Sequence, residues 1–277
     1  MNIPNVMYRE RHEKMELFSL ESFTQRSKLY SPAPSDLHRV DFHCLLRHKS
    51  HGSHCIDFKN YEYKPGDMVY IAPGQVHAYD FNNTPCGEVI IFTKAYYQEI
   101  KSYLPDDPLQ LCKQAPVWQP DQALSEIIDR TLELIDLQQH SALPSISNKL
   151  LFTNLLVNIS QTQKKFITEP QQKFKYQELI TLVYNNMNTT RHAKDYAKLM
   201  AMSYSKLNNI CLKASGNTLK RSIDNQIILE AKRILVTESL NINQLSEHLG
   251  FDETTNFVKF FNRHTGISPK QFRQHRL

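Results

Sequence analysis

Residues 250–273 read GFDETTNFVKFFNRHTGISPKQFR, and the fold of the C-terminal part of the chain can be predicted from them. Three of its phenylalanines, Phe257, Phe260 and Phe261, recur at helical spacing, which predicts an amphipathic helix over residues 253–264 with one buried stripe. Gly266 follows where a helix needs a left-handed C-cap, and Ser268 then offers a capping oxygen ahead of Pro269 at the first helical position. The stretch therefore predicts a helix, a sharp stop and the start of another helix.

The same pattern occurs a second time upstream. Residues 197–202 align with residues 246–251 at an offset of 49, and residues 207–216 align with residues 257–266 at an offset of 50. Each copy predicts a short helix, a tight turn and a longer helix, which is helix-turn-helix architecture. The predicted short helices cover residues 194–200 and 243–249, and the predicted longer helices cover residues 203–214 and 253–264.

The outward faces of the two longer helices are polar and cationic. For one isolated helix the simpler interpretation is a solvated face, but two matching copies favour a face that reads base edges in a major groove. The predicted base-facing residues are Ser205, Lys206, Asn208, Asn209 and Lys213 in the first copy and Thr254, Thr255, Asn256, Lys259, Asn262 and Arg263 in the second. The predicted phosphate contacts are Lys198, Lys220, Arg221, Lys270 and Arg273.

These motifs resemble the AraC/XylS-type DNA-binding domain, and residues 250–273 closely follow the signature of that family. The resemblance runs from Phe174 to Arg276. It implies two helix-turn-helix units joined by a long helix, here residues 221–236, with the reading helices in major grooves about 34 Å apart. The sequence departs from the family pattern at Ala201, where the turn usually has Gly, at Ile227, where the joining helix usually has Arg, and at Lys206 and Asn256, where an aromatic is frequent.

Charge is distributed unevenly over the 277 residues. Residues 1–169 contain 17 Lys and Arg against 20 Asp and Glu, whereas residues 170–277 contain 16 against 8, so the two parts carry −3 and +8. A basic half joined to a mildly acidic half is typical of a nucleic-acid binder with a separate control module. The apolar runs fall far short of the ~20 residues of a membrane span, the N-terminal residues do not form a signal peptide, and the five cysteines form no CxxC pair. We therefore expect a soluble, cytoplasmic protein without membrane contacts.

Residues 37–93 have the composition of β structure. Short runs rich in Val, Ile, Phe and Tyr alternate with turn residues, which predicts a sandwich or barrel. The predicted strands cover residues 40–46, 55–58, 68–71 and 89–92, with turns at residues 51–53, 64–67 and 73–74. Two amphipathic helices follow, one from Asp121 and one over residues 145–161, and we expect residues 121–161 to mediate a homodimer.

Residues 66–77, GDMVYIAPGQVH, resemble the second motif of the cupin barrels that many AraC-type regulators use as effector-binding domains. This resemblance implies a small-molecule pocket inside the barrel, with aromatic walls and a polar anchor at Arg39 or His77. An ordinary barrel core is the alternative for each residue. The predicted pocket residues are Arg39, Phe42, Phe58, Tyr70, His77 and Tyr79.

Metal chemistry is poorly supported by the sequence. In catalytic cupins the histidine of this motif joins two His and one Glu from an upstream HxH…E motif, and only His77 has a match here. His48, His51 and His54, flanked by two cysteines, form an alternative cluster, but they would splay around a hairpin tip at His51-Gly52. We predict no metal, no cofactor and no catalytic residue.

The sequence as a whole predicts a two-domain regulator. Residues 1–165 form a cupin-like effector-binding and dimerisation domain, residues 166–173 a linker, and residues 174–277 the tandem helix-turn-helix domain. The expected partners are double-stranded DNA, a small-molecule effector and RNA polymerase. Two alternatives stay open: a cupin enzyme with an accessory basic domain, which would require a bound transition metal, and a regulator controlled by a protein partner or by its abundance.

Overall fold

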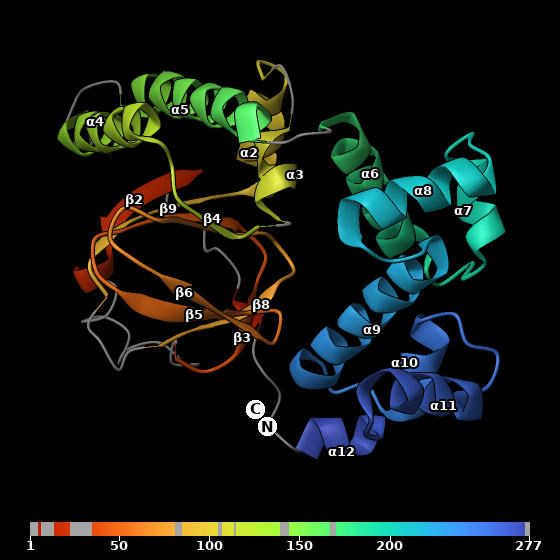
Figure 1. The fold of residues 1–277 in the computed structure, drawn as a ribbon. Helices are drawn as coiled ribbons and strands as arrows, with labels where there is room; N and C mark the ends of the chain where they lie inside the picture. The colour runs from red at the N-terminus through yellow and green to blue at the C-terminus, as the bar shows by residue number, and fades with distance from the viewer. Residues whose placement is uncertain are drawn as a thin grey trace. The chain divides into compact units, whose positions relative to one another are not determined.

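The computed structural model describes residues 5–6, 14–22, 35–80, 85–104, 107–113, 115–138, 144–166 and 170–274. The chain divides into two compact units, with the boundary between residues 168 and 169. The N-terminal unit is built on β-sheets and the C-terminal unit is helical (Figure 1). The sequence predicted a cupin-like β-barrel with two following α-helices and then an all-α tandem helix-turn-helix domain. A β-sheet-rich unit followed by helices and an all-α C-terminal unit are confirmed.

The N-terminal unit contains two five-stranded sheets. Their strand orders are β1-β3-β8-β5-β6 and β10-β7-β4-β9-β2. β1 pairs with β3 in parallel, and the other described pairs are antiparallel. The strands are β1 (Asn5–Val6), β2 (Met15–Ser19), β3 (His38–Val40), β4 (His43–His48), β5 (Gly52–Ile56), β6 (Lys59–Tyr63), β7 (Met68–Ile71), β8 (Val76–Tyr79), β9 (Gly87–Phe92) and β10 (Val117–Trp118).

The second sheet has a buried core on each face, because successive side chains of a strand point to opposite sides. Cys44 and Leu46 of β4 belong to the core between the two sheets, together with Ile56 and Tyr79 from the first sheet. Leu45, between them, belongs to the core on the other face. All six residues of β4 are therefore buried.

Among the described residues of this unit four helices follow β9, and α4 and α5 lie over the second sheet (Figure 1). Leu124, Ile128 and Ile135 of α4 and Phe152 and Ile159 of α5 pack into the core beneath them. The helices are α2 (Lys94–Lys101), α3 (Pro108–Cys112), α4 (Gln122–Gln138) and α5 (Pro144–Phe166).

Arg47 fixes α4 to the sheet. Its side chain, only 7% exposed, donates to Asp129 Oδ1 at 2.9 Å, to Ser125 Oγ at 2.8 Å and to the carbonyl oxygen of Gly66. Burial of a guanidinium costs free energy unless its donors are satisfied, and four acceptor atoms satisfy this one, since Asp129 Oδ2 also accepts at 3.1 Å.

One strand prediction and one turn prediction in this unit were wrong. The strand predicted over residues 40–46 is two strands in different sheets, β3 and β4, interrupted at residues 41–42. Residues 51–53, predicted as a turn, are instead the last residue of a loop and the first two residues of β5. The hairpin formed by β5 and β6 turns at Asp57-Phe58, whose φ angles are 51° and 66°. Positive φ at both central positions is the type I′ geometry, which usually takes Asn-Gly, so Asp-Phe gave no turn signal.

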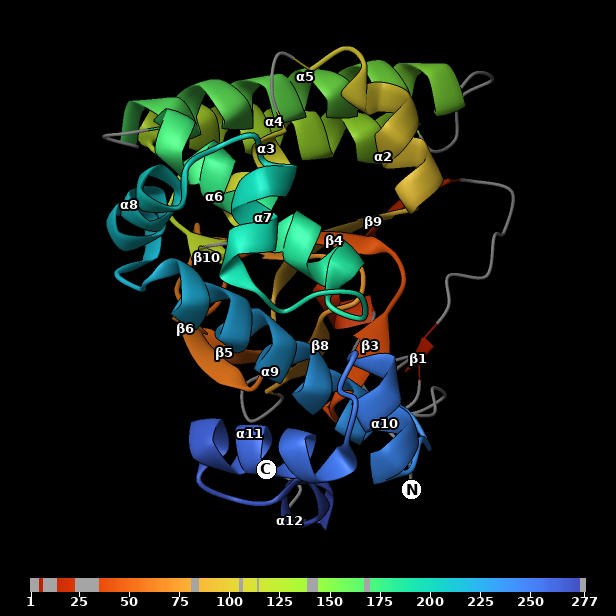
Figure 2. The ribbon, with the colours of Figure 1, turned by 90° about the vertical axis from the view of Figure 1, so that its right-hand side faces the viewer.

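The C-terminal unit is assembled around the long helix α9 (Leu219–Thr237). α6 (Pro170–Asn186) and α8 (Tyr204–Ser215) both contact it, and α12 (Pro269–Gln274) packs near its end. The remaining helices are α7 (Ala193–Leu199), α10 (Ile242–His248) and α11 (Thr254–Thr265). α9 runs from the α7–α8 pair to the α10–α11 pair (Figures 1 and 2).

The linker expected at residues 166–173 is shorter than predicted. α5 ends at Phe166 and α6 already begins at Pro170. Proline suits the first position of a helix because its missing N–H would have no intrahelical partner there. Residues 170–173 therefore belong to a helix of the C-terminal unit.

Candidate nucleic-acid interface

Two helix-turn-helix units are present, α7–α8 and α10–α11. The longer helices α8 and α11 end at Gly216 and Gly266, with φ angles of 69° and 81°, so both predicted left-handed caps are confirmed. Thr218 Oγ1 then accepts from Arg221 N at the start of α9, and Ser268 Oγ accepts from Gln271 N at the start of α12. The two copies of the repeat thus have the same local structure.

The two turns differ at equivalent positions. Gly250, in the second turn, has a φ of 72°, and a Cβ atom there would lie 2.6 Å from the carbonyl oxygen of Asn188. Ala201, in the first turn, has a φ of 51°. A residue with a Cβ atom pays about 1 kcal/mol or more for left-handed backbone, so the family departure at Ala201 leaves the backbone strained without changing its path.

The inward faces of α8 and α11 are buried as predicted, with one exception. Leu207 and Cys211 of α8 and Phe257 and Phe261 of α11 are buried completely. Phe260, predicted to be inward, is only partly buried and lines a cavity instead.

Most of the predicted base-facing residues are exposed. Those that are exposed are Ser205, Lys206, Asn209 and Lys213 on α8 and Thr255, Asn256, Lys259, Asn262 and Arg263 on α11. Thr254 is half-buried. Asn208 is also half-buried, and its Oδ1 accepts from Leu219 N at 2.9 Å. The prediction for Asn208 needs correction, because its side-chain oxygen already caps the start of α9.

The predicted phosphate contacts also divide into two groups. Lys198, Arg221 and Lys270 are exposed, and Lys220 is exposed with its ammonium paired to Asp224. Arg273 is different, since its guanidinium donates to the carbonyl oxygens of Leu235 at 3.2 Å and Leu240 at 2.6 Å. These two bonds fasten α12 to the end of α9, so Arg273 has a structural task that the sequence did not reveal.

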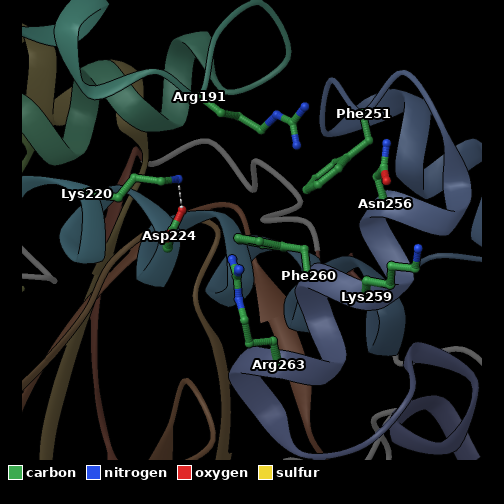
Figure 3. A pocket seen from close by; sticks show the side chains of 8 residues that line it. All are labelled: Arg191, Lys220, Asp224, Phe251, Asn256, Lys259, Phe260 and Arg263. Atoms are coloured by element: carbon green, nitrogen blue, oxygen red, sulfur yellow. Dashed lines mark hydrogen bonds and ion pairs between the residues drawn. The ribbon is translucent and has the colours of Figure 1, made fainter.

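A cavity of about 420 Å³ lies between the two helix-turn-helix units (Figure 3). Asn256 and Lys259 of the second reading helix line it, as does Lys220 at the start of α9. Arg191, which precedes α7, and Phe251, which precedes α11, complete its walls with Asp224, Phe260 and Arg263. Sequence reasoning missed Arg191, because it belongs to neither reading helix.

A second cavity, of about 570 Å³, is lined by the first unit and the start of α9. It includes Lys194 and Lys198 of α7, Tyr204 of α8 and Lys220, which lines both cavities. The surface of this unit is therefore cationic next to both reading helices, as binding to a polyanion requires.

In the N-terminal unit the structure gathers only three of the predicted effector-pocket residues. Phe42 and Tyr79 belong to the core between the sheets, and the ring of His77 lies 5.6 Å from that of Tyr79. Tyr70 lies on the opposite face, in the core under the helices, where its hydroxyl is 2.7 Å from His43 Nδ1.

Arg39 and Phe58 also differ from the prediction. Arg39 lies between His38 and Val40 on β3, and Val40 faces the core between the sheets, so strand alternation places Arg39 on the outer face. Phe58 lies in the hairpin turn. The alternation of side chains along a strand does not show which face is the core before the strand register is known. For this reason the sequence misplaced Arg39, Phe58 and Tyr70.

Histidines that the sequence did not bring together meet between the sheets. His54 Nε2 lies 3.0 Å from His77 Nδ1, and the rings of His38 and His77 are 4.1 Å apart. Burial is the main cause that lowers the pKa of all three imidazoles, and that of His54 and His77 falls well below the usual range. The strand register sets this cluster, because His38 stands opposite His77 and His54 opposite Tyr79.

His48 is buried nearby and its ring stacks on Tyr63 with centroids 3.5 Å apart, while His51 is exposed. His48, His51 and His54 thus do not converge. No group of three or more His, Cys, Asp or Glu side chains in the described part of the chain is arranged to hold a metal ion. Among the described residues, no helix is long and apolar enough to cross a membrane.

Comparison with known proteins identifies relatives of the chain. The helix-turn-helix domain family matches residues 196–275. The arabinose operon regulatory protein of Salmonella typhimurium is 24% identical over 222 residues, which cover 76% of this chain and 75% of the relative. The transcriptional activator RhaR of Salmonella dublin is 21% identical over 233 residues, 81% of this chain and 82% of the relative. Among solved structures, ToxT from Vibrio cholerae is 13% identical with a TM-score of 0.44, covering 85% of this chain and 90% of that one.

Proposed function

We propose, from the AraC-type helix-turn-helix domain that this chain carries, that the protein is a sequence-specific DNA-binding transcriptional regulator. The observation that supports this most directly is the pair of reading helices, α8 and α11, with exposed polar and cationic side chains at matching positions. Their caps, turns and buried faces are those of two folded units, so the outward side chains are held for contact with an external surface.

Chemistry suggests how each helix reads DNA. In a major groove, an asparagine amide pairs bidentately with adenine, and a lysine ammonium donates to the O6 and N7 acceptors of guanine. Asn256 and Lys259 on α11 correspond to Lys206 and Asn209 on α8, so both helices present this pair of side chains in reverse order. We infer that the two half-sites differ in sequence.

The test uses a duplex selected by the full chain from a random-sequence library. Lys259→Ala and Asn256→Ala should each weaken binding about 5- to 150-fold, and should relax the choice of base at one position of one half-site. Lys94→Ala, which removes an exposed lysine of α2 outside the helix-turn-helix domain, is the matched control. Unchanged affinity and unchanged base preference in both variants would remove α11 from base recognition.

We propose residues 1–165 as the control domain and residues 174–277 as the DNA-binding domain. Between the sheets of the control domain, both ring nitrogens of His48, Nδ1 of His54 and Nε2 of His77 are buried without a hydrogen-bond partner among the described residues. Such groups favour a ligand with hydrogen-bonding atoms. A metabolite that raises the melting temperature of the wild type but not of His54→Phe would support this effector site. No shift across a broad panel would favour control by a protein partner or by abundance.

We also propose that α4 and α5 form a homodimer interface. Four large apolar side chains are exposed where α4 ends and α5 begins. They are Leu134 and Leu137 on α4 and Ile146 and Leu150 on α5. Exposed apolar side chains that lie together mark interaction surfaces. In sedimentation velocity, the pair of substitutions Leu137→Lys and Leu150→Lys should convert a dimer to a monomer, while Leu212→Lys on α8 should not. A wild type that is monomeric at all concentrations would refute this interface.

The remaining assignments follow from the regulator role. The relatives are transcription regulators and not enzymes, so we propose no catalytic activity. We place the protein in the cytoplasm with the bacterial chromosome, where RNA polymerase is its expected partner in changing transcription.

A further inference from the structure

The cavity between the two helix-turn-helix units contains more positive charge than its own residues neutralise (Figure 3). Four cations line it, Arg191, Lys220, Lys259 and Arg263, against the single carboxylate of Asp224. That carboxylate is already paired with Lys220 Nζ at 2.5 Å. Arg191, Lys259 and Arg263 make no ion pair with any described residue. The cavity is therefore suited to an anion supplied from outside.

Aromatic rings lie beside two of these cations. The guanidinium carbon of Arg191 lies 3.7 Å from the ring centroid of Phe251, and that of Arg263 lies 5.9 Å from the ring centroid of Phe260. A ring occupies only the face of a guanidinium, so its N–H donors remain free along the edge. Those donors match the spacing of two phosphate oxygens.

The aromatic rings are themselves fixed. Phe251 is only 5% exposed, and its ring lies 5.3 Å from the rings of both Phe257 and Phe260. In the close-up, Phe251 and Phe260 lie at the centre of the cavity, with Arg191 and Arg263 on opposite sides of them (Figure 3). A guanidinium held on such a platform loses less side-chain freedom when it binds an anion.

We propose that this cavity binds the phosphodiester backbone of DNA between the two major grooves that α8 and α11 enter, with Arg191 and Arg263 as its phosphate ligands. Arg263, predicted from the sequence to face the bases, is thereby assigned to the backbone instead. The proposal rests on the proposed function. Asn256 and Lys259 line the cavity and also belong to the outward face of α11, so DNA on that face brings its backbone to the cavity. Arg191 is on neither reading helix, and its contact adds affinity without base preference.

A free phosphorylated metabolite offers the same phosphate chemistry as the backbone, and the experiment distinguishes the two sources. The full chain is titrated with a random-sequence duplex of about three helical turns at salt concentrations between 50 and 200 mM. Each phosphate contact contributes about 0.9 to the slope of log affinity against log salt. Arg191→Ala should therefore flatten the slope by about 0.9, so that its affinity deficit shrinks about 3.5-fold over this fourfold range.

Arg191→Lys keeps the charge and should recover most of the slope but not the affinity, because an ammonium lacks the bidentate edge. Arg130→Ala is the matched control, since Arg130 is exposed on α4 and pairs with Glu133 of the same helix. Circular dichroism melts show whether each variant folds. If Arg191→Ala does not fold, Arg263→Ala replaces it, with the same expected slope.

Two results would overturn the inference. In the first, the wild type binds duplex DNA, and the folded variants Arg191→Ala and Arg263→Ala show the same salt slope as the wild type. That result would remove the cavity from the DNA contact, while the proposed function would stand. Stabilisation of the wild type but not of Arg191→Ala by inorganic phosphate, together with that unchanged slope, would identify a free-anion site. A wild type that binds no DNA would instead refute the proposed function.

Discussion

His48 provides a test of the N-terminal core through a single substitution, His48→Phe. The imidazole is fully buried, stacks on Tyr63, and has no hydrogen-bond partner at either ring nitrogen among the described residues. A buried polar atom without a partner costs about 1–3 kcal/mol, and a phenyl ring of similar shape removes that cost while keeping the stack. His48→Phe should raise the free energy of unfolding by about 1 kcal/mol at pH 7.5.

The pH dependence gives a second, larger signal. Burial lowers the pKa of His48 from 6.5 to about 4, so the fold favours the neutral imidazole. Its contribution to stability is present above pH 6.5 and is lost as the pH falls towards 4, because the unfolded chain then binds a proton that the folded chain does not. Between pH 7.5 and 5.0 this one group should cost the wild type about 2 kcal/mol, and the variant should be spared that loss.

Trp118 makes the measurement specific. It is the single tryptophan of the chain and lies in β10, paired with β7, so its fluorescence reports the unfolding of the N-terminal unit in urea. His51→Phe, a histidine exposed three residues away, is the matched control and should lose as much stability at pH 5.0 as the wild type. Equal losses in His48→Phe and the wild type, or destabilisation of His48→Phe at pH 7.5, would refute the reasoning.

Three further substitutions test the contacts that hold the elements together. Gly250→Ala should destabilise the C-terminal unit by about 2 kcal/mol, because the new Cβ would meet the backbone of Asn188. The reciprocal substitution Ala201→Gly should stabilise the unit by about 0.5–1 kcal/mol. The melting temperatures of the two variants must therefore shift in opposite directions. Arg47→Met should lower the stability of the N-terminal unit by about 2–3 kcal/mol, seen in Trp118 fluorescence, and a loss under 0.5 kcal/mol would show that the bonds to α4 contribute little. Arg273→Ala should lower the melting temperature without flattening the salt slope of DNA binding; the reverse pattern would restore Arg273 as a phosphate contact.

The helix-turn-helix units were readable from the sequence because their determinants are local. A helix needs apolar residues three and four apart and a cap at each end, and Gly216, Gly266 and Thr218 supply those signals within a few residues. Even the strained turn was visible, since Ala201 stands where the second copy has Gly250. Predicted and observed ends of these helices differ by one residue at each end.

The tasks of Asn208 and Arg273 could not be predicted in the same way. Asn208 bonds to the start of the next helix, and Arg273 bonds to carbonyl oxygens more than 30 residues away. Spacing along one helix shows which side chains face outward but not which of them meet a neighbouring element. Arg191 was missed for the same reason, because its place beside Phe251 arises from the packing of two units.

The interior of the N-terminal unit depended on strand register. The composition correctly predicted β structure, but Tyr70 and His77 face different cores, and only the pairing of β3, β5 and β8 shows which residues meet. The turn at Asp57 is a further example, since the aspartate is held there by bonds from Gln75 and Val76 that lie 18 and 19 residues away. The two-residue alternation of side chains along a strand does not show which side chains face the core until such long-range contacts are known.

The central claim, that two helices of one chain read DNA together, is tested most directly by selecting duplexes from a random library with the full chain and footprinting the winning sequence. We predict one enriched motif with two protected elements about one helical turn apart, where Asn256→Ala relaxes one element and Asn209→Ala relaxes the other. Absence of an enriched motif, or protection of a single element that both substitutions affect alike, would contradict the claim.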